Sequence, residues 1–228
     1  MARVGLALKI AVFATGCAGI VAEFVLSTLA TYLIGNAVFQ WTIVMSLMLF
    51  SMGVGSRLSK FFQHRLLETF ILIEFTLSAL CASSAVIAYG LAAYTSHINL
   101  LIYFLAMLIG GLVGLEIPLV MRINEAYEEL RSNIATVMEK DYYGALLGGL
   151  FFAFFGLPYL GLTYTPILLG AINFLVASLL LWFFLHLIQR KKAMTTAFVV
   201  GLFFLGFLGA FAKPIIMYGE QRLYRDKV

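Results

Sequence analysis

Long apolar stretches dominate the sequence, and short polar or glycine-containing stretches separate them. A helix needs about 20 apolar residues to cross the hydrocarbon core of a membrane, and most of these stretches reach that length. Because a lipid-exposed backbone must satisfy its own hydrogen bonds, a helix is the expected conformation of each stretch. The pattern predicts seven membrane-spanning helices at residues 5–34, 37–55, 70–94, 98–121, 142–157, 165–187 and 195–218.

Basic residues alternate between the predicted connections. Arg3 and Lys9 lie at the N-terminus, whereas the connections at 35–36, 96–99 and 157–164 contain no Lys or Arg. Cytoplasmic connections carry an excess of Lys and Arg, so we expect the N-terminus and the basic connections to be cytoplasmic. The basic residues of those connections are Arg57, Lys60, Arg65, Arg122, Arg131, Lys140, Arg190, Lys191 and Lys192.

An odd number of crossings has a consequence for the C-terminal tail. Seven full crossings from a cytoplasmic N-terminus place Arg222, Arg225 and Lys227 on the opposite side of the membrane. Either the tail is external, or one segment does not cross fully. The short segment 142–157 and the glycine-rich segment 195–218 are the two candidates for an incomplete crossing.

The composition agrees with this pattern. The chain of 228 residues is 63% hydrophobic and 11% charged, against about 25% charged residues in an average soluble domain. We therefore expect an all-α, polytopic integral membrane helix bundle over residues 1–218, in the inner cell membrane, with the lipid bilayer as its main partner. A nucleic-acid partner is not expected, because the net charge of +4 comes from basic residues at helix ends.

The longest connection, residues 122–140, has its own periodicity. Apolar residues recur in it every three or four positions, which predicts an amphipathic cytoplasmic helix at the membrane surface. The alternative is a docking site for a soluble partner. The apolar positions are Ile123, Tyr127, Leu130, Ile134, Val137 and Met138.

Four carboxylates, Glu23, Glu74, Glu116 and Asp141, lie within or at the ends of predicted membrane helices. A charge at mid-bilayer costs about 2.5–3.5 kcal/mol or more, so these groups should face the bundle interior. One interpretation is a structural polar cluster that includes Arg122. A second is a proton or cation path through Glu23 and Glu116, and a third is snorkelling to the interface without partners.

Small residues recur at four-residue spacing in three predicted helices. Gly110 and Gly114 form one pair, Gly144 and Gly148 form another, and Gly55 follows a serine at the same spacing. Such pairs let helix backbones approach closely in lipid. We interpret them as packing positions within the bundle, and a homo-oligomer is also compatible with them.

The sequence contains no recognisable catalytic motif. It has no glycine-rich phosphate loop after a predicted strand, no H-E-x-x-H motif and no nucleophilic triad. Its three histidines lack metal-ligand spacing. We therefore expect no catalytic residue, no metal and no cofactor in this chain.

Four stretches of the sequence place single polar residues within apolar surroundings. They are GIVAEFVLSTLATYLIGNAVFQWTIVMSLMLFSMGVGSRLS, GLVGLEIPLVMR, DYYGALLGGLFFAFFGLPYLGL and YGEQRLYRDKV. With Glu23, Glu116, Arg122 and Asp141 in place, the chain resembles the N-terminal transmembrane domain of membrane-integrated spermidine synthase-like proteins, the polyamine aminopropyltransferases.

The resemblance implies that the tail at 219–228 is a linker. In that family such a segment leads into a soluble synthase domain with a Rossmann-like fold. That domain carries a glycine-rich acidic motif for decarboxylated S-adenosylmethionine and an Asp that assists aminopropyl transfer to putrescine. The sequence ends before these motifs, so no catalytic residue of the family can be assigned here. It is either a fragment or a stand-alone relative, and whether it belongs to an enzyme stays open.

The resemblance favours a membrane-embedded, non-catalytic module that anchors a soluble synthase domain or subunit. Its relation to polyamines would rest on Glu23, Glu116 and Asp141, whose carboxylates could meet a polyamine cation. One alternative is a small major-facilitator-like transporter or half-transporter, suggested by FSMGVGSRLSKFFQHR between the second and third helices. The other is a structural subunit that binds a soluble partner through residues 122–140.

Overall fold

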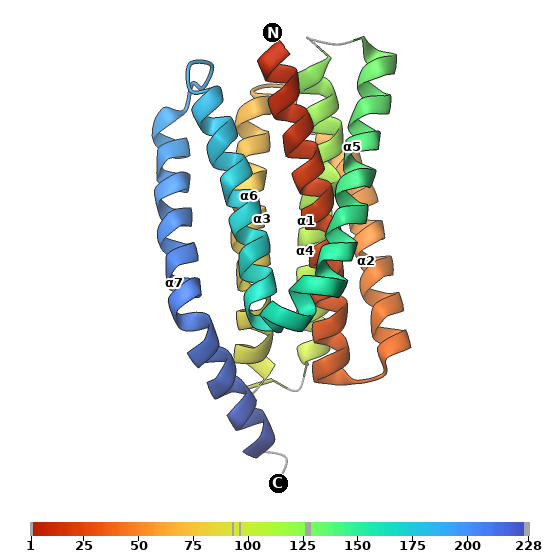
Figure 1. Ribbon diagram of the computed structural model, residues 1–228, viewed down its shortest axis with the longest axis vertical. Coiled ribbons are helices and arrows are strands. Elements are labelled where there is room, and N and C mark those ends of the chain that lie inside the picture. The colour runs from red at the N-terminus through yellow and green to blue at the C-terminus, as the bar shows by residue number, and fades with distance from the viewer. Residues whose placement is uncertain (1, 93, 96, 126–128, 226–228) are drawn as a thin grey trace.

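The computed structural model describes the chain except residues 1, 93, 96, 126–128 and 226–228 (Figure 1). The described residues form an all-α bundle without a strand, which confirms the predicted fold class. A short 3₁₀ turn at Ser59–Phe61 and a π-helical segment, η2, at Phe152–Leu160 interrupt or join the long helices. The long helices are α1 (Ala2–Ile34), α2 (Ala37–Leu58), α3 (Leu66–Ala92), α4 (Ile98–Asn124), α5 (Leu130–Phe151), α6 (Gly161–Phe183) and α7 (Lys191–Arg225).

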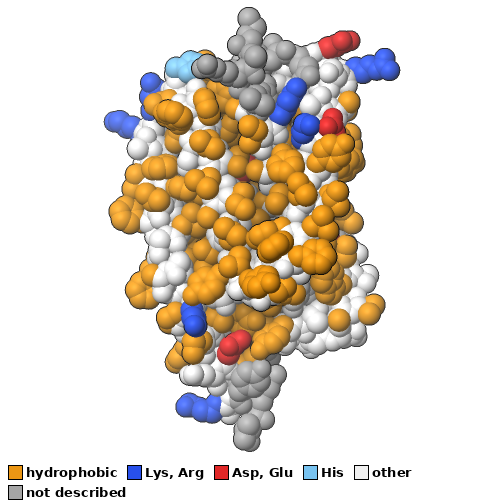
Figure 2. Space-filling model, viewed as in Figure 1, with side chains coloured by type: hydrophobic (Ala, Val, Ile, Leu, Met, Phe, Trp, Pro, Cys, Tyr) orange, Lys and Arg blue, Asp and Glu red, His pale blue; other side chains and the backbone are white. Residues whose placement is uncertain are grey.

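The helices are long and apolar enough to cross a membrane. Within the described residues, six stretches qualify by length and composition, one of which is a 53-residue stretch, Arg131–Phe183, that runs through α5, η2 and α6. The face shown in Figure 2 carries mostly apolar side chains along its middle, and charged side chains lie toward its two ends. This distribution is typical of a bundle whose middle lies in hydrocarbon.

Successive helices run in opposite directions (Figure 1). The α2–α3, α4–α5 and α6–α7 connections therefore lie at the same end as the N-terminus, which we call the basic end. The α1–α2 and α3–α4 connections and the C-terminus lie at the opposite end. The alternation of basic and uncharged connections in the sequence thus corresponds to two ends of one bundle.

The two segments that are candidates for an incomplete crossing, 142–157 and 195–218, differ in helix continuity. The α7 helix runs without interruption from Lys191 to Arg225. The α5 helix instead passes into η2, which contains Pro158 and ends at Gly161 with a φ of 63°. Figure 1 shows that η2 turns the chain sideways before it reaches the level of the α1–α2 connection. Proline removes a backbone donor and glycine permits positive φ, which explains the position of this turn.

Residues 122–140, predicted as one amphipathic helix, are shared between the end of α4 and the first turns of α5. The α4 helix ends at Asn124 and α5 begins at Leu130. The Asn124 side chain donates to Asn133 Oδ1 at 2.9 Å, and Asn133 Nδ2 donates to the Met121 carbonyl oxygen at 2.7 Å. These buried hydrogen bonds hold the first turns of α5 against α4, so they do not lie flat on a lipid surface.

The tail predicted to begin at residue 219 continues α7 as helix to Arg225. It also contacts the bundle. Tyr32 donates its hydroxyl hydrogen to Glu220 Oε1 at 3.5 Å, and Arg222 Nη1 donates to the Tyr94 hydroxyl at 3.1 Å. The Arg222 guanidinium lies 4.2 Å from the centre of the Tyr94 ring, a cation–π contact that adds to the hydrogen bond.

Glycines allow the closest helix contacts. A methyl group at Gly110 would lie 2.8 Å from the Met48 carbonyl oxygen on α2, and one at Gly148 would lie 2.6 Å from the Cys17 carbonyl oxygen on α1. All the glycines that the sequence singles out for packing (Gly55, Gly110, Gly114, Gly144 and Gly148) lie this way against the backbone of a neighbouring helix. Dispersion contacts along these backbones stabilise helix pairs that lipid alone would not drive together.

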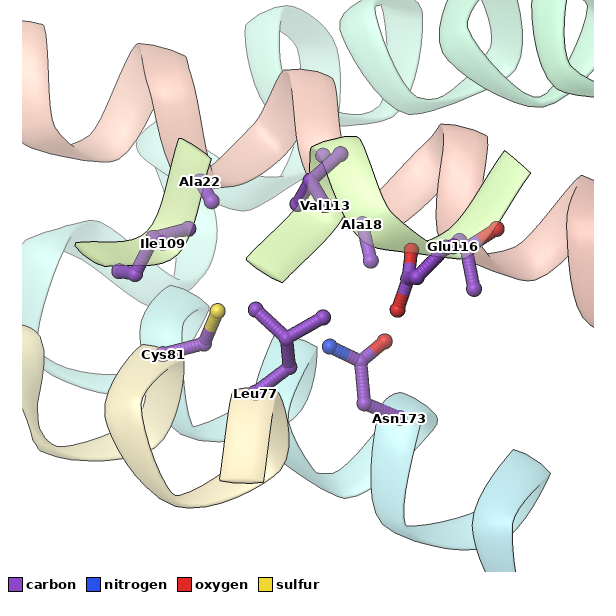
Figure 3. A pocket seen from close by; sticks show the side chains of 10 residues that line it. Ala18, Ala22, Leu77, Cys81, Ile109, Val113, Glu116 and Asn173 are labelled. Atoms are coloured by element: carbon purple, nitrogen blue, oxygen red, sulfur yellow. The ribbon is translucent and has the colours of Figure 1, made fainter. Parts of the chain in front are cut away.

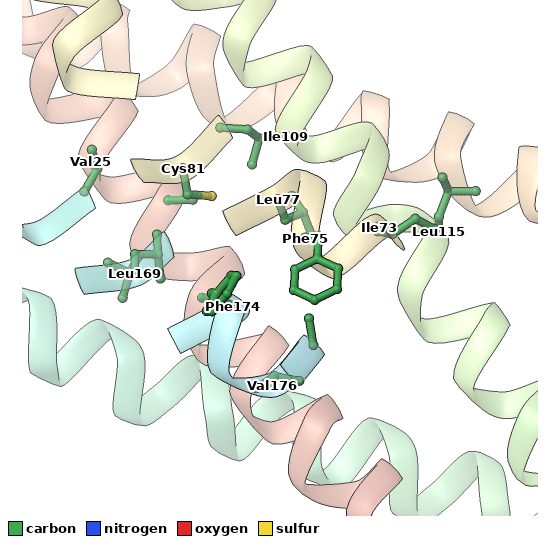
Figure 4. Packing of buried hydrophobic residues seen from close by; sticks show 14 of the residues in the cluster. Val25, Ile73, Phe75, Leu77, Cys81, Ile109, Leu115, Leu169, Phe174 and Val176 are labelled. Atoms are coloured by element: carbon green, nitrogen blue, oxygen red, sulfur yellow. The ribbon is translucent and has the colours of Figure 1, made fainter. Parts of the chain in front are cut away.

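A continuous apolar core fills the space around α3. Figure 4 shows Phe75 and Leu77 of α3 near Phe174 of α6 and Ile109 of α4. The rings of Phe75 and Phe174 have centroids 5.4 Å apart in a tilted arrangement, a geometry that aromatic pairs favour. This core surrounds the few buried polar residues described next.

Candidate functional site

Three buried polar side chains from three helices meet at one level of the bundle. Glu74 lies on α3, Glu116 on α4 and Asn173 on α6; we call these three residues the interior site. Each lies eight to ten residues from the end of its helix at the basic end. At a rise of 1.5 Å per residue, that places them roughly 12–15 Å inside the bundle.

The interior site is shielded from solvent. Glu74 is 0% exposed, and Glu116 and Asn173 are each 2% exposed. Both carboxylate oxygens of Glu74, Oε1 of Glu116 and Oδ1 of Asn173 have no hydrogen-bond partner among the described residues. Since buried polar groups are nearly always hydrogen-bonded, this concentration of unpartnered oxygens marks the region out from the rest of the core.

A narrow cavity adjoins Glu116 and Asn173 (Figure 3). Both side chains point into it, and Thr15 of α1 is among the residues that line it. The rest of the lining is apolar or weakly polar, and the space is too narrow for a water molecule. The Cys81 thiol lines the same cavity and lies within electrostatic reach of Glu74 and Glu116.

Asp141, on α5, lies at the edge of this region. It packs against Gly16 of α1, where a methyl group would lie 2.8 Å from Asp141 Oδ1. Asp141 is half-buried. The charged groups that act electrostatically on Glu116 include Glu74 and Asp141, both acidic. The site therefore combines two buried carboxyl groups with a third that is closer to the surface.

The structure separates two sequence-predicted residues from this cluster. Arg122 donates to the carbonyl oxygens of Ser59, at 2.8 Å, and Phe62, so it holds the α2–α3 connection and not the carboxylates. Glu23 is buried, but it lies eight residues beyond Thr15 on α1, about 12 Å further from the basic end. Glu23 is not among the residues that line the cavity, and a path through Glu23 and Glu116 stays a prediction.

Sequence reasoning did not single out Glu68 or Asn173. Glu68 is buried in the first turn of α3, and its Oε1 accepts hydrogen bonds from the backbone N–H groups of Gln189, at 2.6 Å, and Arg190, at 3.4 Å. It fixes the connection between α6 and α7. Asn173 is one asparagine within a long apolar stretch, and that isolation is the signal that could have identified it.

The arrangement offers few routes to covalent chemistry. No group of three or more His, Cys, Asp and Glu residues that could hold a metal comes together among the residues the structure describes. Cys17 and Cys81 are free thiols. Two carboxyl groups and an amide oxygen in a dry interior can, however, bind a proton or a cation.

A larger hollow of about 620 Å³ opens between α2, α3 and α4. Its walls are almost entirely apolar and include Phe50, Phe104 and Leu112. It is separate from the interior site.

Comparisons with known proteins identify relatives along nearly the whole chain. Polyamine aminopropyltransferase 2 of Aquifex aeolicus is 44% identical over 226 residues, which cover 99% of this chain and 45% of that protein. The polyamine aminopropyltransferases of Leptospira interrogans and Oceanobacillus iheyensis are 36% and 33% identical, over 97% and 92% of this chain and 45% and 42% of their own lengths.

The chain therefore spans less than half the length of these relatives. The resemblance to spermidine synthase-like proteins that the sequence predicts is confirmed by their names. No protein-family model matches the chain, and no solved structure matches it.

Proposed function

We propose that this chain, which is homologous over nearly its whole length to part of the polyamine aminopropyltransferases, is the membrane-embedded, non-catalytic module of such a protein. Its role in this proposal is to anchor the aminopropyltransferase to a bilayer. The relatives are named for aminopropyl transfer. In this proposal, that reaction belongs to the part of the relatives that this chain does not match.

One observation carries the proposal. The match covers 99% of this chain but only 45% of the Aquifex aeolicus relative, and the matched residues are a bundle of long apolar helices. Aminopropyl transfer joins polar, charged substrates, which need a hydrated pocket. The cavity beside Glu116 is too narrow for one water molecule, and the larger hollow between α2, α3 and α4 is apolar. We therefore assign the transfer reaction to the remaining half of the relatives' length.

The experiment compares the 228-residue chain with the full-length Aquifex aeolicus relative. Both are purified in detergent and assayed for aminopropyl transfer from decarboxylated S-adenosylmethionine to putrescine. We expect turnover from the relative and none from this chain, because the cavity beside Glu116 is too narrow for water and the larger hollow is apolar. Turnover by the isolated chain would refute the non-catalytic assignment. Loss of the chain from the membrane pellet after an alkaline wash would refute the anchoring role.

The location we propose is the inner cell membrane, with several crossings and the basic end in the cytoplasm. The support is the Lys and Arg content of the connections at that end and its absence from the described residues of the α1–α2 and α3–α4 connections. In this orientation α7 ends on the other side. A single cysteine introduced at His64 should react with a membrane-impermeant maleimide only after the membrane is opened. Labelling at this position in intact cells would reverse the orientation. Both native cysteines are replaced by alanine for this measurement.

A further inference from the structure

The unpartnered oxygens of the interior site come from three different helices. Two belong to Glu74, one to Glu116 and one to Asn173, and all three side chains are at least 98% buried. Figure 3 shows the Asn173 amide and the Glu116 carboxylate pointing into the same space. Buried carboxylate and amide oxygens without a hydrogen-bond partner are candidate ligands for a hard cation, since such cations prefer carboxylate and carbonyl oxygens.

The surroundings make the site electronegative. Glu74 and Asp141 both act on Glu116, and both are acidic. Arg122 is the basic residue nearest to Glu116 along α4, but its guanidinium is occupied with the Ser59 and Phe62 carbonyl oxygens. An ionised carboxylate in a dry, apolar interior is strongly unfavourable unless a positive charge compensates it. A proton or a bound cation can supply that charge.

The size of the cavity selects among cations. It is too narrow for a water molecule, so it is also too narrow for the methylene chain of a polyamine, whose carbon atoms are bulkier than water. A bare alkali-metal ion of sodium size is smaller than a water molecule, so the narrow space beside Glu116 does not exclude it.

We propose that Glu74, Glu116 and Asn173 form a binding site for one small monovalent cation of sodium size, held without its water shell. Asp141 lies where such an ion would reach the site from the basic end, since it is half-buried between α1 and α5 and interacts with Glu116. This function goes beyond anchoring and does not depend on aminopropyl transfer. The two proposals can therefore fail separately.

The first experiment measures the melting temperature of the purified chain in detergent at pH 8, with NaCl replacing choline chloride at constant ionic strength. A ligand that binds the folded state raises the melting temperature in proportion to the logarithm of its concentration over its dissociation constant. At about tenfold excess over that constant, a chain of this size should gain roughly 3–5 °C. KCl should have a smaller effect, because the larger ion fits the narrow site less well.

Matched variants locate the effect. Glu116→Gln keeps the size of the side chain but removes its charge, and it should abolish the sodium response. Glu139→Gln removes an exposed carboxylate whose partner is Lys140 at 2.9 Å, and it should leave the response unchanged. Helical circular dichroism and a monodisperse elution profile verify that each variant is folded. If Glu116→Gln does not fold, Asn173→Leu replaces it, with the same expected loss.

Three results would overturn the proposal. One is a wild-type melting temperature that does not respond to NaCl at pH 8. Another is stabilisation by acid alone, which would show that a proton neutralises the carboxylates. The third is a sodium response that survives in folded Glu116→Gln or Asn173→Leu protein, which would place the ion elsewhere.

Discussion

Glu68 and Glu74 lie six residues apart on α3 and are both buried, at 6% and 0% exposure, yet their surroundings differ completely. Glu68 accepts two backbone hydrogen bonds from the α6–α7 connection. Neither oxygen of Glu74 has a partner among the residues described. A partnered buried carboxylate can stabilise a fold, whereas an unpartnered one is unfavourable and persists only if something else requires it. The first is structural, and the second belongs to a candidate binding site.

The largest effect on stability is expected from a substitution that admits water to the interior. Such a substitution should also reduce the difference in surroundings between Glu68 and Glu74. A methyl group in Gly16→Ala would press on Asp141 and force α5 away from α1. We expect a loss of about 2–3 kcal/mol in the free energy of unfolding, as for other overpacked contacts. Water that enters beside Glu116 would also weaken the sodium response. Denaturant-induced unfolding in mixed micelles measures the loss.

The control for Gly16→Ala is Gly206→Ala on α7. No heavy atom lies within 4 Å of a methyl group at Gly206, so nothing opposes it. Alanine has the higher helix propensity, so this variant should be stabilised by up to about 1 kcal/mol. Equal effects of the two substitutions would contradict the tight α1–α5 contact.

Replacing each glutamate with leucine sharpens the comparison at smaller cost. Glu68→Leu removes the acceptor for the Gln189 and Arg190 N–H groups, and we expect a loss of about 1–2 kcal/mol. Glu74→Leu removes an unpartnered acid from an apolar core, and in sodium-free buffer it should be neutral or stabilising by about 1 kcal/mol or more. The same unfolding measurement compares both variants with wild type.

The comparison depends on which of the two leucine variants has the lower free energy of unfolding in sodium-free buffer. If Glu74→Leu destabilised the sodium-free protein more than Glu68→Leu did, Glu74 would have a structural partner after all. The division of α3 into a structural and a binding carboxylate would then be lost.

The sequence predicts the fold class and the helix ranges well, because hydrophobic length determines both. It predicts α2 and α4 nearly to their ends, where Asn36 and the basic connection after Gly55 interrupt the apolar pattern. It does not locate the boundary between α4 and α5 within residues 122–140, because a helical periodicity does not reveal that the Asn124 and Asn133 side chains form a hydrogen bond.

The site is predicted only in part. Glu74, Glu116 and Asp141 are conspicuous as acids in apolar surroundings, and Glu74 and Asp141 both act electrostatically on Glu116. Arg122 is equally conspicuous. The direction of its side chain, however, is set by hydrogen bonds to the carbonyl oxygens of Ser59 and Phe62, whose positions the sequence does not reveal. The position of Glu23 relative to the site depends on how far α1 and α4 are shifted along the bundle axis. Helix packing sets that shift, and the residue pattern within one helix does not reveal it.

The most direct test is equilibrium binding of radioactive sodium ions to the purified wild-type chain at pH 8, with Glu74→Gln beside it. The account predicts saturable binding of about one ion per chain in the wild type and none in the variant, because oxygens of both carboxylates are needed to hold a bare cation. No saturable binding by the wild type, or equal binding by folded Glu74→Gln, would contradict it.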